Sequence, residues 1–77
     1  MHPPLRNQLR SLDRALLSLL DERTRLLLAV EAGDPGRAPA IEDMLRRHDG
    51  PFPADGVAEV FCAVDRHCAG FAREERG

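Results

Sequence analysis

The chain has 77 residues, of which 43% are hydrophobic and 31% charged, and its formal net charge is −2. This length and balance predict one small folded domain rather than a disordered segment. No apolar run approaches the roughly 20 residues that span a bilayer, and the net negative charge gives no electrostatic case for a nucleic-acid partner. Because charged helix begins too early to leave room for a signal peptide, we expect a cytoplasmic protein that does not bind membranes.

The first predicted element is a long helix over residues 3–32. Pro3 and Pro4 suit its first turn, where a proline loses no internal hydrogen bond. Apolar residues then recur in alternating steps of four and three, the spacing of the a and d positions of a heptad. We call this row the leucine stripe, and it consists of Leu5, Leu9, Leu12, Leu16, Leu19, Leu26 and Val30.

This predicted helix is too long for a compact monomer of the same chain. About 29 residues at 1.5 Å each give a rod of roughly 43 Å, whereas a compact chain of 77 residues is about 30 Å across. A second apolar row widens the face beyond the leucine stripe, at Leu17, Leu20, Leu27 and Leu28. We therefore expect two copies of the chain to dimerise along this helix.

Within the spacing of the leucine stripe, position 23 holds an arginine. A guanidinium stays charged, and burying one without a partner costs several kcal/mol. Arg23 must therefore pair with an internal carboxylate, reach solvent at an end, or bind an anionic ligand. We expect the ligand. An Arg23 held by one of the protein's own acids, or a chain that is a monomer, would contradict this interpretation.

Two shorter helices are predicted over residues 39–48 and 54–74. Pro39 can open the first of them, and Asp49-Gly50-Pro51 ends it. The second carries an apolar row that we expect to be buried, at Val57, Val60, Phe61, Val64, Cys68 and Phe71. Because no strand-like alternation is found, the predicted fold class is all-α, with a long, a short and a medium helix in one domain.

The sequence gives little sign of metal or cofactor chemistry. Cys62 and Cys68 lie six residues apart on one predicted helix and so on different faces, and we expect two buried thiols without a disulfide. With no second ligand pair, a packed helix with one exposed histidine, His67, is favoured over a metal site. We expect no cofactor.

Two arginines of the first helix point to a shared anion site. Arg6 and Arg23 are about 25 Å apart along a helix axis, so one chain cannot bring both to a small ligand. An antiparallel or crossed partner helix would place Arg6 of one chain near Arg23 of the other. Such a pair suits a small dicarboxylate, because each guanidinium can hold a carboxylate through two parallel hydrogen bonds. The alternative for Arg6 is a solvated residue at the helix start.

The order of residues in this helix resembles the all-α (type II) chorismate mutases. The matching residues are Leu5-Arg6, Leu12-Asp13, Leu16-Leu17, Leu19-Leu20 and Glu22-Arg23, which follow the family's LRxxIDxLDxxLLxLLxxR-like pattern. Weaker similarity to the family's GPLP…IF segment is found at Gly50-Pro51-Phe52-Pro53 and Val60-Phe61. The resemblance covers about 30 residues well and another 25 loosely, and it puts both arginines in the family's register.

The resemblance implies an intertwined helical dimer that converts chorismate to prephenate in aromatic amino-acid biosynthesis from the shikimate pathway. This pericyclic rearrangement needs no cofactor, covalent intermediate or proton transfer. Each active site would take Arg23 from one chain and Arg6 from the partner chain, and these two residues would hold the two carboxylates of chorismate.

Several other family positions differ in this sequence. The lysine that contacts the ether oxygen falls at Asp34, and Arg37 is a candidate to replace its charge. Glu42 lies beside the position of the glutamate that binds the substrate hydroxyl. The usual serine falls at Cys68, and the side chain that donates to the ether oxygen falls at Ala72, which has no donor. Loss of one such donor costs about 10²–10³ in rate in other enzymes.

Three hypotheses therefore remain open. The first is a reduced chorismate mutase, or a relative that acts on a similar dicarboxylate such as isochorismate. The second is a binding or regulatory module that keeps the anion pocket without the reaction and modulates a partner enzyme of aromatic biosynthesis. The third is a helical dimerisation element with no small ligand.

Overall fold

The computed structural model describes residues 3–31 and 33–76, and all regular structure within them is helical. The elements are α1 (Pro3–Ala29), the short 3₁₀ helix η1 (Pro35–Arg37), α2 (Ile41–Arg47) and α3 (Ala54–Arg76). The predicted all-α class and the order of long, short and medium helices are confirmed. No helix among the described residues has both the length and the apolar character that crossing a bilayer requires.

The predicted helix ends differ from the observed ends by a few residues. α1 begins at Pro3 as predicted but ends at Ala29, and the predicted last residue, Ala32, lies outside the described residues. The helix ends early in a tighter turn. In this turn the Val30 amide donates to the Leu27 carbonyl at 3.3 Å. α2 is shorter than predicted, and α3 continues two residues beyond the predicted end at Glu74.

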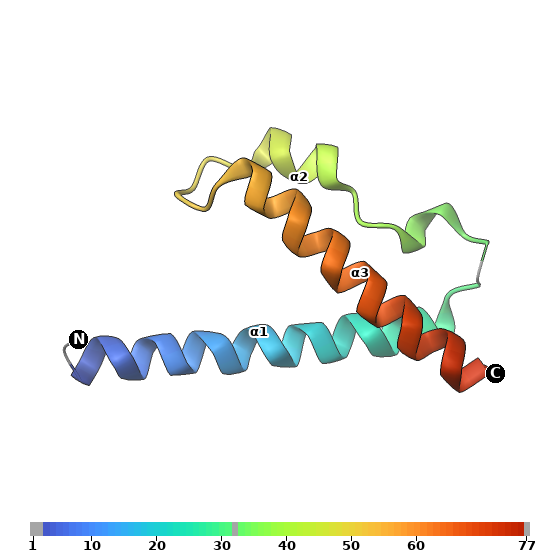
Figure 1. The fold of residues 1–77 in the computed structure, drawn as a ribbon, viewed down its shortest axis with the longest axis horizontal. Coiled ribbons are helices and arrows are strands. Elements are labelled where there is room, and N and C mark those ends of the chain that lie inside the picture. The colour runs from blue at the N-terminus through green and yellow to red at the C-terminus, as the bar shows by residue number, and fades with distance from the viewer. Residues whose placement is uncertain (1–2, 32, 77) are drawn as a thin grey trace.

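α1 projects well beyond the helices that pack on it. Figure 1 shows α3 crossing the C-terminal part of α1, while α2 lies against the first half of α3 and the N-terminal half of α1 stands apart. The radius of gyration is 14.9 Å and the longest extent 46 Å, against a radius near 11–12 Å for a compact chain of this length. The fold is therefore more extended than a self-sufficient domain of its size.

A small apolar core holds α1 against α3. Leu27 of α1 packs with Cys68 and Ala72 of α3, and all three are buried, with Val64 packed beside them. Ala72 is fully buried because its small side chain lets the two helices approach closely. This core anchors only the last turns of α1, which explains why the rest of that helix extends into the open.

The leucine stripe is exposed in the single chain, and its expected burial in a dimer stays a prediction. Six of its leucines are 47–65% exposed, namely Leu5, Leu9, Leu12, Leu16, Leu19 and Leu26. The apolar row of α3 is likewise only partly covered, since Val57 and Cys68 are buried whereas Val60 and Phe71 are exposed. The physical reason is the crossing of α1 and α3, which brings together the C-terminal part of α1 and the second half of α3 (Figure 1).

Candidate anion-binding site

Arg23 lies where α1, α3 and the η1 segment meet. Its Nη2 donates to the carboxylate Oδ1 of Asp65 on α3 at 3.3 Å and to the backbone carbonyl of Arg37 at 3.3 Å. The side chains of Arg23 and Asp65 are 24% and 35% exposed, respectively. Of the three alternatives for Arg23, pairing with an internal carboxylate is the one observed in the single chain.

This ion pair satisfies the guanidinium only in part. Charge-assisted N–H···O bonds are usually about 2.7–2.9 Å long, and strong arginine–carboxylate pairs are bidentate, whereas Arg23 and Asp65 make one longer contact. The second terminal nitrogen, Nη1, is buried and has no hydrogen-bond partner among the described residues. Since an unsatisfied buried donor costs about 1–3 kcal/mol, Arg23 keeps a capacity to bind an additional acceptor.

Three segments of the chain contribute to the surroundings of Arg23. The Arg23 guanidinium, the Asp65 carboxylate and the backbone carbonyl of Arg37 meet here, and we call these three residues the Arg23 cluster. η1 brings the Arg37 backbone to Arg23, and the Asp34 side chain starts η1 by accepting the Gly36 amide at 2.7 Å.

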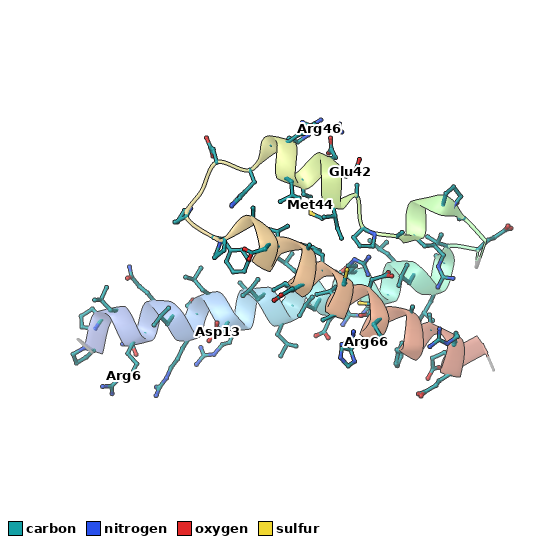
Figure 2. All side chains as sticks on the ribbon, turned by 45° about the horizontal axis from the view of Figure 1, so that its top comes forward. Arg6, Asp13, Glu42, Met44, Arg46 and Arg66 are labelled. Atoms are coloured by element: carbon teal, nitrogen blue, oxygen red, sulfur yellow. The ribbon has the colours of Figure 1, made fainter. Side chains whose placement is uncertain are left out.

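Arg6 lies at the other end of α1. It is exposed near the start of the helix, and Figure 2 shows it at the N-terminal end of α1, remote from α2 and α3. Its separation from Arg23 is about 25 Å along the helix axis. A single chain therefore does not join these two predicted site residues, as the sequence argument anticipated.

Cys68 belongs to the core rather than to the Arg23 cluster. Its Sγ lies 3.0 Å from Oγ1 of Thr24, and Oγ1 also lies 2.8 Å from the carbonyl of Leu20. Because a hydroxyl has one hydrogen, which goes to the carbonyl, the Cys68 thiol is the donor to Thr24. Cys68 is buried and Cys62 is exposed, so the prediction of two buried thiols is correct only for Cys68.

The other family positions have structural surroundings of their own. Asp34 caps the turn that forms η1, and Ala72 is packed at 0% exposure inside the α1–α3 core. Glu42 is exposed on the first turn of α2 (Figure 2) and lines a shallow hollow whose lining does not include Arg23. Of the predicted site residues, the structure thus brings Arg23 and Arg37 together and leaves Glu42, Cys68 and Arg6 elsewhere.

Sequence reasoning missed Asp65, although a signal for it was present. Asp65 lies four residues after Phe61 and three before Cys68, which places an acid beside the apolar row of α3. An acid there and an arginine within the leucine stripe are complementary if the two helices pack. Only the crossing of α1 and α3 decides that they meet.

A wide hollow lies between α1 and α3. Its volume is about 700 Å³, and its lining includes apolar residues of both helices, among them Leu20, Val60, Val64 and Phe71. Neither Arg6 nor Arg23 lines it, so it is distinct from the Arg23 cluster. This hollow extends the apolar surface that the single chain leaves uncovered.

Comparison with known proteins adds no assignment: no family model, no curated protein and no solved structure matches this chain.

Proposed function

We propose that this chain is a chorismate-mutase-like cytoplasmic homodimer that binds chorismate and converts it to prephenate. The observation that carries the proposal is the register of Arg6 and Arg23 on one unbroken helix that leaves its leucine stripe exposed. The same helix thus presents an apolar surface for a partner and the two cations that a shared dicarboxylate site requires.

The exposed stripe provides enough apolar surface to support such a dimer. Its six leucines are 47–65% exposed, and complete burial of one leucine contributes about 1.5–3 kcal/mol. Covering the exposed fractions in both chains is therefore worth about 8–24 kcal/mol. Association costs about 4–15 kcal/mol, so the surface is of the size that a stable dimer needs.

Binding and catalysis in the proposed dimer follow from charge and position. Arg23 of one chain and Arg6 of the other each hold one carboxylate of chorismate, which restrains the dianion in the diaxial shape that rearranges. Negative charge that develops on the ether oxygen needs a nearby cation or donor. Arg37 is the candidate for this part, because its backbone already contacts Arg23.

The second candidate is a dicarboxylate-binding or regulatory module without catalysis that acts on an enzyme of aromatic biosynthesis. Two observations favour it. Ala72 has no donor and is fully buried, and Asp65 puts a negative charge against Arg23, where a substrate carboxylate would bind. Each would slow a reaction that depends on positive charge and hydrogen-bond donors. The Nη1 of Arg23, which has no partner among the described residues, would still be able to bind an anion.

Two measurements on the full chain separate these functions. Loss of chorismate absorbance above the uncatalysed rate, absent in Arg23→Leu, would support the enzyme. A rise in melting temperature with chorismate but no turnover would support the binding module, because a ligand that binds only the folded state stabilises it. If chorismate is not turned over and does not raise the melting temperature, both proposals are contradicted and the chain is a dimerisation element without a small ligand.

A further inference from the structure

The two terminal nitrogens of the Arg23 guanidinium differ in their hydrogen bonding. Nη2 carries two hydrogens, and it contacts two acceptors, the Asp65 carboxylate and the Arg37 carbonyl. Nη1 is buried and has no partner among the described residues. A carboxylate that binds end-on to an arginine accepts one hydrogen bond from Nη1 and one from Nη2. A ligand bound in this way needs an Nη2 hydrogen, and Nη2 already donates to Asp65 and to the Arg37 carbonyl.

We infer that Asp65 is an internal competitor for the ligand carboxylate and sets the affinity of the site for dianions, an inference that rests on the proposed function. Of the two acceptors on Nη2, the Arg37 carbonyl is part of the backbone of η1. Asp65 is a side chain that is 35% exposed and makes a single contact of 3.3 Å with Arg23. It can therefore rotate into solvent when a ligand takes its place.

The competition has two electrostatic parts. Displacing Asp65 breaks its contact with Arg23, and the displaced carboxylate still repels an incoming dianion from a few ångströms away. Both parts weaken the binding of anions in the wild-type protein. Replacement of Asp65 by asparagine removes the charge and keeps the shape, so chorismate should bind about 5- to 30-fold more tightly at low salt. The difference should shrink as salt screens the charges.

The test compares the full-length wild type with Asp65→Asn, with Asp65→Ser as a second variant in case the first does not fold. Glu59→Gln is the matched control, because Glu59 is an exposed acid on the same helix and its loss changes the net charge equally. Calorimetry gives the dissociation constant for chorismate. Thermal shifts with inorganic sulfate, measured relative to Glu59→Gln, report anion binding at Arg23 without any need for chorismate.

The outcomes separate this inference from the proposed function. Tighter chorismate binding by the Asp65 variants, but not by Glu59→Gln, supports both. If the Asp65 variants gain stabilisation by sulfate but neither they nor the wild type bind chorismate, the competition is supported and the proposed function is contradicted. Unchanged or weaker binding of both anions overturns the inference, since Asp65 would then be neutral or would hold Arg23 in its binding position. Unfolding of both Asp65 variants overturns it too, because a displaceable contact cannot be essential to the fold.

Discussion

Replacing Leu16 by alanine tests whether the leucine stripe is a dimer interface. Leu16 is 58% exposed in the single chain, and covering that fraction is worth about 0.9–1.7 kcal/mol. A two-fold dimer contains the substitution twice, so it should lose about 1.7–3.5 kcal/mol of association free energy. This loss corresponds to a dissociation constant raised by about 20- to 300-fold.

Sedimentation equilibrium over a range of concentrations measures this dissociation constant directly. Arg14→Ala is the control, because Arg14 is exposed on the same helix but lies outside the stripe, and we expect it to leave the constant within about threefold of wild type. A protein that stays monomeric at high concentration, or a Leu16→Ala dimer as tight as wild type, would refute the argument from the exposed leucines.

Three further substitutions address the site and the core. Arg23→Leu should change the free energy of unfolding by less than about 1 kcal/mol, because the pair with Asp65 is partly exposed, and it should abolish thermal stabilisation by chorismate. A larger loss of stability in urea denaturation would indicate a structural ion pair. Thr24→Val should cost about 0.5–1.5 kcal/mol in the same assay, since it removes the acceptor of the Cys68 thiol, and no loss would mean that this contact is not made. Ala72→Gln should destabilise the fold by about 1–3 kcal/mol through overpacking without raising the rate of chorismate conversion, because residue 72 is fully buried. A faster reaction would show that residue 72 reaches the substrate.

The apolar periodicity predicted the helices well but not their partners. Heptad spacing identified the leucine stripe and its helix, because side-chain period depends on local geometry alone. It did not indicate which chain covers the stripe, and the single chain leaves it exposed. The end of α1 was also placed too late, since Val30 continues the spacing although the hydrogen bonds tighten at Leu27.

The candidate site was predicted in part. Arg23 was singled out because a permanent charge breaks an apolar row, and the structure places it in a polar cluster beside Arg37. Asp65 was not anticipated as its partner, because contacts between residues 42 positions apart depend on how two helices cross. Sequence spacing fixes neither the crossing angle nor the depth of packing, and these also bury Ala72 in the core.

Each proposed anion site combines Arg23 of one chain with Arg6 of the other, and mixing two inactive variants distinguishes this shared site from a site within one chain. Arg6→Ala and Arg23→Leu homodimers should each fail to bind chorismate. After unfolding and refolding together, half of the dimers are mixed and each has one intact site, so about a quarter of the wild-type sites should return. Recovery of that fraction in calorimetric titration is the predicted result. No recovery, or normal binding by the Arg6→Ala protein alone, would contradict the shared site.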